Sequence, residues 1–277
     1  MRARRGYGWA LLVGGVLACG GARAGSLKVD YGLWLSGLPL GEAGLSTQID
    51  GDRYRTELKV QLTGLAGAVT GGRAAANSAG QIAGGRTVPG GFAITSASSS
   101  AQRSIRLGLA GGNVTEVSIT PPLEDKAERV PVTEAHRRAI VDPVSALVMP
   151  APGRGDLTDP TLCNRTLPVF DGGARFDVVL SYSETRQAAL GGYSGPVLVC
   201  NARYVPVAGH RPDRPGTKFM EDNRDMSVWL APVPGERVLV PLRIQVATTA
   251  GRSVIEATRW TPGPGPAALR GSVAPAR

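Results

Sequence analysis

RYRTELKVQL, at residues 53–62, alternates apolar and polar side chains. The apolar side chains stand at even positions, at Tyr54, Leu58, Val60 and Leu62. Alternation with a period of two is typical of an antiparallel strand with one face on a core and the other in water. This stretch therefore predicts a half-buried strand, and the same pattern recurs along most of the chain.

Similar runs occur at residues 27–35, 104–109, 114–120, 175–183, 197–205, 226–230, 238–248 and 253–260. Turn-forming residues separate them, such as Asp-Gly-Asp at 50–52 and Asp-Gly-Gly at 171–173. The chain is therefore predicted to be all-β, an antiparallel meander that closes on itself as a β-spiral or open barrel. Barrels and sandwiches reach this size as one unit, so residues 25–260 are predicted to form a single domain.

The strongest helix signal lies inside VPVTEAHRRAIVDPVSALVMP, residues 130–150. Asp142 is suited to cap a helix and Pro143 to begin it, because proline loses no hydrogen bond at the first helical position. Val144, Leu147 and Val148 then form one apolar stripe, and Pro150 ends the element. The pattern predicts one short helix packed on or in the sheet, where it closes a core or roofs a pocket.

Three segments depart from the strand pattern. Residues 64–91 are rich in Gly, Ala, Ser and Thr, and both bent strands and a flexible loop fit this composition. Residues 208–224 carry Arg, Asp, Pro and Lys and are predicted to form a surface loop. The proline- and glycine-rich residues 261–277 are predicted to be a disordered tail.

Residues 1–24 have the three parts of a secretory signal peptide. Arginines at positions 2, 4 and 5 precede an apolar run, and Ala22 and Ala24 frame a cleavage site before Gly25. The apolar run is too short to span a bilayer as a stable helix, and no later segment is long and apolar enough to do so. The alternative is a lipoprotein anchor at Cys19, although Val16 to Gly20 match a lipoprotein box only loosely.

The formal net charge of the whole chain is +9. Four arginines and no acidic residues precede Gly25, so the chain from Gly25 onward carries a net charge of +5. This charge is spread along the chain rather than clustered, so nucleic acid is not expected as a partner. Weak attraction to an anionic lipid or polymer surface is compatible with the remaining charge.

Two cysteines, Cys163 and Cys200, follow the signal segment. An even pair in an exported protein predicts one disulfide bond, and the alternative is a reactive thiol. The two histidines, His136 and His210, lie far apart without metal-ligand spacing, so no metal site and no cofactor are expected.

No catalytic constellation emerges from the sequence. Gly192–Pro196 fails the nucleophile-elbow pattern because proline occupies its last glycine position. The chain also lacks a glycine-rich phosphate loop before a helix and paired histidines on one helix face. The sequence therefore favours a protein without catalytic activity.

Five motifs in order resemble a known bacterial family. They are GLPLG at 37–41, DPVSAL at 142–147, LPVFDGGARFD at 167–177, CNARY with PVAG at 200–209, and PLRI at 241–244. Together they resemble the periplasmic domain-of-unknown-function family 3108, over Val29 to Thr258, and are similar to the neighbouring envelope-integrity proteins that fold as a β-spiral. The resemblance implies a periplasmic curved sheet, similar to lipoprotein carriers or lipocalins, with a role in envelope homeostasis and no catalytic residues.

Three hypotheses about function follow. The first is a hydrophobic hollow for a lipid or another apolar ligand, lined by Leu33, Leu35, Leu58, Val60, Leu147, Val148, Met149 and Val240. The second is a structural scaffold with a filled core that binds a periplasmic envelope protein. The third is an unrecognised envelope hydrolase.

Overall fold

The computed structural model describes residues 25–123 and 128–263. The predicted signal peptide, Cys19 and residues 264–277 of the predicted tail lie outside the described residues. The strands are β1 (Gly25–Leu35), β2 (Leu38–Asp50), β3 (Arg53–Leu62), β4 (Arg73–Ala83), β5 (Arg86–Ala97), β6 (Gln102–Ala110), β7 (Asn113–Thr120), β8 (Met149–Pro150), β9 (Arg165–Phe170), β10 (Arg175–Leu190), β11 (Tyr193–Ala208), β12 (Met226–Pro232), β13 (Val238–Thr248) and β14 (Gly251–Pro262). The helices are α1 (Gly64–Thr70) and α2 (Pro215–Asp222), with short 3-10 helices η1 (Glu134–Arg137), η2 (Ser145–Leu147) and η3 (Pro160–Cys163).

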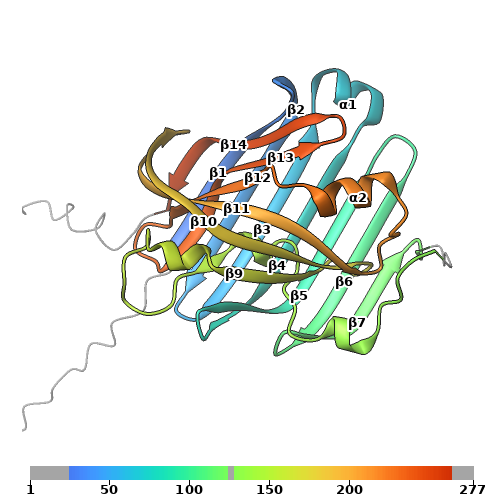
Figure 1. Ribbon diagram of the computed structural model, residues 1–277, viewed down its shortest axis with the longest axis horizontal. Coiled ribbons are helices and arrows are strands. Elements are labelled where there is room, and N and C mark those ends of the chain that lie inside the picture. Colours follow the sequence, from blue (N-terminus) through green and yellow to red (C-terminus); the bar gives the residue numbers. More distant parts are fainter. Residues whose placement is uncertain (1–24, 124–127, 264–277) are drawn as a thin grey trace, which may run out of the picture.

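All fourteen strands belong to one antiparallel sheet with the order β7-β6-β5-β4-β3-β2-β1-β14-β13-β12-β11-β10-β9, and β8 pairs with β13. The pairing of β1 with β14 joins the first strand to the last, so two meanders form one continuous sheet. Figure 1 shows β1 to β7 as a broad rear layer and β9 to β13 curling across its front. The sheet is open rather than closed, because β7 and β9 are its two edges. This confirms the predicted all-β spiral or open barrel.

Residues 139–141 connect the two edges of the sheet at one point. Ile140 N–H donates to the carbonyl of Gly112, in the turn before β7, with an N···O distance of 2.9 Å. On the other side, Val141 N–H donates to Pro168 of β9 at 2.9 Å, and Phe170 N–H donates to Val141 at 2.9 Å. A segment without regular strand structure therefore bridges the opening here.

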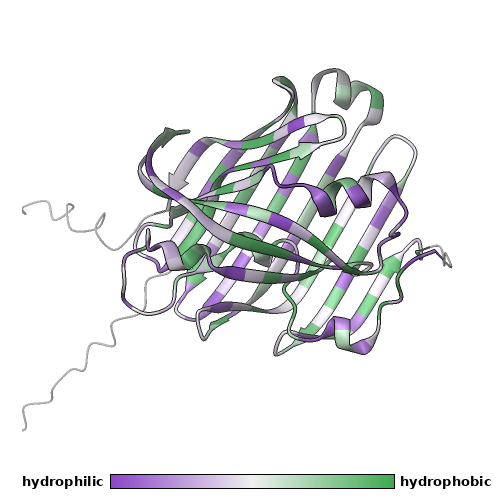
Figure 2. Ribbon diagram, viewed as in Figure 1, coloured by the Kyte–Doolittle hydropathy of each residue, from purple (hydrophilic) through white to green (hydrophobic). Residues whose placement is uncertain are grey.

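The burial of β3 follows the predicted alternation. Tyr54 and Thr56 are buried on the inner face, whereas Arg55, Glu57 and Lys59 are exposed on the outer face. Figure 2 shows such alternation as bands of opposite hydropathy along the strands. The longest strands extend past their predicted limits, because β10 and β11 continue as a hairpin to Leu190 and Tyr193. Residues 184–187 of that hairpin are exposed on both faces, which removes the alternation from the sequence.

The glycine- and alanine-rich segment 64–91 is ordered as α1, β4 and the first part of β5. Ala76 and Ser78 of β4 are buried, whereas Ala75 and Asn77 are exposed. The alternation is present, but it uses small side chains whose hydropathy differs little. Of the two alternatives for this segment, strands are correct and a flexible loop is wrong.

The predicted helix at residues 142–149 is shorter than expected. Only Ser145–Leu147 is helical, in a 3-10 turn whose N-cap is Val144 rather than Asp142, and Pro143 therefore lies before the helix. The element ends early because Met149 pairs with Leu239 of β13, which draws the chain into β8. The remaining differences are small: the predicted loop at 208–224 contains α2, and β14 continues to Pro262 in the predicted tail.

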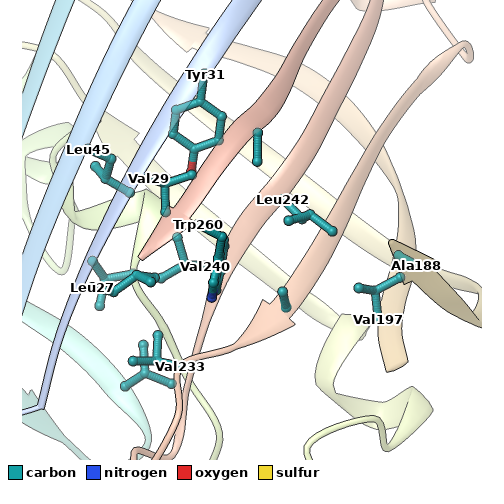
Figure 3. Packing of buried hydrophobic residues seen from close by; sticks show 14 of the residues in the cluster. Leu27, Val29, Tyr31, Leu45, Ala188, Val197, Val233, Val240, Leu242 and Trp260 are labelled. Carbon is teal, nitrogen blue, oxygen red and sulfur yellow. The ribbon is translucent and has the colours of Figure 1, made fainter. Parts of the chain in front are cut away.

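The largest group of buried apolar side chains fills the bend where β1 meets β14 and β13. Figure 3 shows Leu27, Val29, Leu45, Val240 and Trp260 converging there from strands far apart in sequence. A second cluster surrounds a disulfide bond between Cys163 and Cys200, whose Cα atoms lie 5.5 Å apart. This bond confirms the predicted disulfide, and it ties η3 to the centre of β11.

Candidate ligand-binding hollow

The inner face of β1 changes from buried to partly exposed along the strand. Leu27, Val29 and Tyr31 are at most 5% exposed, whereas Leu33 and Leu35 are half-buried. The same change occurs on β13, where residues 238–242 are buried and Ile244 and Val246 are half-buried. Both strands lead toward the end of the sheet that carries the β1–β2 turn, α1 and the β13–β14 turn, which we call the α1 end (Figure 1). The inner face is therefore filled at one end of the sheet and less covered at the α1 end.

An apolar cavity of about 240 Å³ lies on this less covered part of the inner face, and we call it the hollow. Its walls come from β9 to β13 and from the segment around η2. The lining residues are Pro143, Ala146, Leu147, Met149, Leu167, Val169, Phe176, Val178, Leu180, Ala202, Met226, Ser227, Val228, Pro241, Ile244, Gln245 and Val246. Only Ser227 and Gln245 bring polar side chains to this lining. Such a surface suits a ligand without charge or hydrogen-bonding groups.

Residues 142–149, which we call the plug, form one wall of the hollow. Ala146, Leu147 and Met149 face the hollow, whereas Val144 and Val148 are each 1% exposed and pack into the buried clusters. The plug thus presents one group of side chains to the cavity and another to the core. It was predicted to close a core or roof a pocket, and its side chains contribute to both.

A buried carboxylate fixes the plug to the sheet. Asp142 Oδ1 accepts the backbone N–H groups of Val144 and Ser145, each at 2.9 Å. Its Oδ2 accepts the hydroxyls of Ser145 at 2.5 Å and of Ser78, on β4, at 2.7 Å. Tyr54 OH lies 2.6 Å from Ser145 Oγ, which connects β3 to the same network. Asp142, Ser145 and Ser78 are each at most 1% exposed, so four donors take the place of water around one carboxylate.

Burial shifts the proton equilibria of this network. Removal from water raises the pKa of Asp142 above its ordinary value, and the hydrogen bonds from Ser145, Ser78 and Val144 oppose that shift. Burial also raises the pKa of Tyr54 to about 12, so its hydroxyl stays protonated and can donate to Ser145. No cationic side chain takes part in these hydrogen bonds, which makes the network a structural anchor rather than an ion pair.

The predicted pocket residues fall into different places. Leu147 and Met149 line the hollow. Val148 and Val240 are buried in the core cluster, at 1% and 0% exposure, and do not line it. Leu58 packs between two of the buried clusters. The structure therefore brings two of these five residues to the hollow.

Leu33, Leu35 and Val60 lie on other strands. Leu33 is opposite Ile255 of β14, which is opposite Ile244 in the lining, so an apolar row connects Leu33 to the hollow. Leu35 joins a second such row through Ser253 and Val246. Val60 borders a separate groove of about 910 Å³ whose other lining side chains include Lys59, Arg73 and Glu42.

Most of the hollow's lining was not singled out from the sequence. Phe176, Val178 and Ile244 lie in predicted strands, and their alternation indicates an inward face. Alternation cannot show which inward side chains are covered by another element, because this depends on strand register. The sequence therefore predicts which side chains face inward, but not which of them line the cavity.

Within residues 25–123 and 128–263, no group of three or more His, Cys, Asp or Glu side chains is arranged to hold a metal ion. No helix in this part of the chain is long and apolar enough to cross a membrane.

The fold and the hollow together define a class of protein: an open antiparallel β-barrel whose inner face is filled at one end and apolar and less covered at the other. The chain belongs to the family described as protein of unknown function DUF3108, whose model matches residues 26–258. This match confirms the family resemblance of the five sequence motifs. The relation to envelope-integrity proteins stays a prediction.

Among solved structures, the chain is similar to the crystal structure of a β-barrel-like protein of the family DUF1849 from Brucella abortus. The identity is 9%, the match covers 86% of this chain and 98% of that one, and the TM-score is 0.48. No curated protein matches the chain.

Proposed function

We propose that this protein is exported to the periplasm and binds the apolar part of a lipid, or another hydrophobic ligand, in the hollow. The observation that carries the proposal is the lining itself, in which only two side chains are polar among residues from five strands and the plug. A filled core would not leave Met226, Ile244 and Val246 half-buried beside one another. Apolar side chains that gather around a cavity favour an apolar guest.

The size of the hollow limits the part of a ligand that it can enclose. At about 240 Å³ it lies just below the ~300–1,000 Å³ of common small-molecule pockets. The apolar rows toward Leu33 and Leu35 extend the surface beyond the enclosed volume. We therefore expect one acyl chain or a compact apolar molecule to lie inside, with its polar end toward the α1 end.

Export is supported by two features of the chain. Residues 1–24 have the pattern of a signal peptide with cleavage after Ala24. The disulfide between Cys163 and Cys200 is typical of an oxidising compartment such as the periplasm. Within the periplasm, a lipid-binding protein would support the integrity of the cell envelope.

Lipid extraction tests the proposal directly. Protein purified from the periplasm is examined by native mass spectrometry and by solvent extraction with lipid analysis. Co-purification of an apolar molecule at fixed stoichiometry is expected. Absence of any bound molecule, together with failure to bind the fluorescent fatty acid cis-parinaric acid, would reject the hollow as a ligand site.

A cavity-filling variant makes the test specific. Ala146 lines the hollow from the plug, so Ala146→Phe is expected to fill the cavity and weaken cis-parinaric acid binding at least tenfold. The matched control is Ala189→Phe, at an exposed position on the β10–β11 hairpin, which is expected to bind as the parent does. Equal binding by both variants would place the ligand elsewhere.

The second candidate function is a scaffold that binds a periplasmic envelope protein. The filled half of the inner face favours it, since Leu27, Val29 and Leu242 leave no room for a guest there. A protein without bound lipid that retains an envelope partner after purification would support this alternative. The hydrolase hypothesis would require turnover of an envelope polymer or lipid that is lost when one acidic residue is replaced.

A further inference from the structure

We propose that the α1 end of the barrel docks on the surface of an anionic lipid bilayer through an apolar rim formed by Leu38, Pro39, Leu40 and Val69. The inference rests on the proposed function, because it assigns the surface from which the hollow receives or releases its ligand. It goes beyond that function, because a ligand can bind inside the barrel without any contact between the rim and a bilayer.

The rim carries two of the three large apolar side chains that are exposed on the described part of the chain. Within residues 25–123 and 128–263, three large hydrophobic side chains are exposed: Leu38 at 68%, Val69 at 75% and Tyr182 at 39%. Leu38 begins β2 and Val69 belongs to α1, and these two elements contact each other. Pro39, between Leu38 and the half-buried Leu40, is also exposed. Clustered apolar exposure of this kind marks a contact surface.

Backbone hydrogen bonds hold the rim in place. Thr63 N–H, just before α1, donates to the carbonyl of Leu40 at 2.9 Å. At the other end of α1, Ser99 N–H from the β5–β6 turn donates to Thr70 at 2.8 Å. Val69 thus stands on a helix that is fixed to the strands on both sides, and Leu38 and Pro39 stand on β2 itself. A fixed apolar surface loses little conformational entropy when it binds.

The rim is continuous with the apolar inner face. Leu38 is the cross-strand partner of Leu35, and Leu35 is followed across the sheet by Ser253 and Val246, which lines the hollow. Figure 1 shows the start of β2 and α1 side by side at the upper edge of the sheet. A ligand that leaves the hollow along this row would therefore meet the rim.

The charge of the adjoining turns fits an anionic surface. The turns next to the rim, residues 36–41, 62–73, 96–103 and 248–253, contain Arg73, Arg103 and Arg252 and no Asp or Glu. The β11–β12 connection, residues 209–225, also reaches this end of the sheet, because Met226 pairs with Val246, and it carries both acidic and basic side chains. Arg73 and Arg103 are exposed, and Arg252 pairs with Asp225 at 2.7 Å. At the opposite end, the turns at 50–53 and 233–237 carry charges of both signs, with Asp50, Asp52 and Glu236 beside Arg53 and Arg237.

Proteins bind a lipid interface through apolar insertion and through electrostatic attraction, and an apolar rim flanked by arginines provides both. The apolar side chains enter the boundary between headgroups and acyl chains, and the guanidinium groups attract anionic headgroups. Two large exposed side chains provide only weak, reversible attachment, which suits a protein that must leave the bilayer again. A second copy of the chain or a protein partner would bury the apolar rim without requiring the arginines to face anionic groups.

Vesicle flotation tests this proposal with the exported protein. The vesicles contain phosphatidylcholine alone or phosphatidylcholine with phosphatidylglycerol. We expect the parent protein to float with the anionic vesicles. Its binding is expected to be at least fivefold weaker in 0.5 M salt than in low salt. The double variant Leu38→Ser/Val69→Ser is expected to bind at least tenfold more weakly, and Arg73→Gln/Arg103→Gln to lose the preference for phosphatidylglycerol. The control Tyr182→Ser, which removes exposed apolar surface far from the rim, is expected to behave as the parent does.

Three outcomes would overturn the proposal. They are absence of parent binding to either vesicle, unchanged binding of the Leu38→Ser/Val69→Ser variant, and conversion of a dimer to a monomer by that variant without loss of vesicle binding. Failure of the proposed function is seen separately, because cis-parinaric acid binding is measured without vesicles. The rim variant is expected to bind this probe with the affinity of the parent and to transfer it to anionic vesicles at least fivefold more slowly.

Discussion

Ser145 Oγ lies 2.5 Å from Asp142 Oδ2, and both side chains are fully buried inside the barrel. The contact joins two residues of the plug, and Ser78 of β4 completes the network from 64 positions earlier in the chain. The position of the plug therefore depends on one carboxylate that is satisfied entirely by hydroxyl and backbone donors. This arrangement has consequences for stability that can be measured.

Replacement of Asp142 should separate hydrogen bonding from charge. Asp142→Ala leaves the backbone N–H groups of Val144 and Ser145 without their acceptor and should lower the free energy of unfolding by about 2–4 kcal/mol. Asp142→Asn keeps one acceptor oxygen and should cost about 1 kcal/mol or less. Urea unfolding at constant pH measures both. Equal losses in the two variants would show that the hydrogen bonds to Oδ1 do not hold the plug.

The same residue should give stability a specific dependence on pH. Burial raises the pKa of Asp142 in the folded state above its unfolded value. The stability that this carboxyl contributes is therefore fully present below the unfolded pKa and is lost as pH rises through the folded pKa. Asp142→Asn lacks this loss, so its stability relative to the parent should increase as the pH rises above the unfolded pKa of about 4. A constant difference between parent and variant over this range would contradict the raised pKa.

The disulfide should stabilise the fold chiefly by restricting the unfolded chain. Cys163 and Cys200 are 37 residues apart, and closing a loop of that length contributes roughly 3–4 kcal/mol in the chain-entropy model. The variant Cys163→Ser/Cys200→Ser should therefore melt about 10 °C below the parent under non-reducing conditions. Differential scanning calorimetry measures the shift. Reduced parent protein is the control and should melt near the variant, whereas equal melting of variant and oxidised parent would exclude a stabilising role.

The sequence predicts the structure correctly where the information lies within one strand or one pair of residues. The alternation around Tyr54 was sufficient for β3, and two cysteines after the signal segment left one pairing. The sequence does not predict features that depend on contacts between distant segments. β4 was ambiguous because its buried side chains are those of Ala76 and Ser78, which are small and only weakly apolar.

The hollow was only partly predictable for the same reason. Leu147 and Met149 were found because the plug has an apolar stripe, and Ile244 was missed although it faces the same cavity. Val148 and Val240 were placed in the pocket by their inward direction, yet other elements cover both of them completely. Inward direction follows from a local period, whereas coverage depends on which strands the spiral brings together.

Two adjacent residues of the plug should respond differently to the same substitution. Leu147 lines the hollow and is only partly buried, so Leu147→Asp should leave the protein folded and abolish binding of cis-parinaric acid. Val148 is 1% exposed in the core, so Val148→Asp buries an unpaired charge and should prevent folding. Near-ultraviolet circular dichroism reports folding, and probe fluorescence reports binding. Unaltered probe binding by Leu147→Asp would show that the plug does not contribute to the ligand site.

The β9–β10 turn should be sensitive to a single methyl group. Gly172 has a φ of +101°, and a Cβ atom there would lie 2.6 Å from Ile105 Cγ2 on β6. Gly172→Ala should therefore lower the free energy of unfolding by about 1–3 kcal/mol, through both backbone strain and overpacking. Gly155→Ala is the matched control, because the nearest atom to its added Cβ is 4.0 Å away, and it should be nearly neutral.

A double-mutant cycle shows whether the contact between the two halves of the sheet causes this loss. In an Ile105→Ala background the crowding is relieved and only the backbone strain remains, so Gly172→Ala should cost about 1 kcal/mol less than in the parent. Urea unfolding of the four proteins gives the coupling energy. If Gly172→Ala costs the same in both backgrounds, the turn does not pack against β6 closely enough to join the two edges of the open barrel.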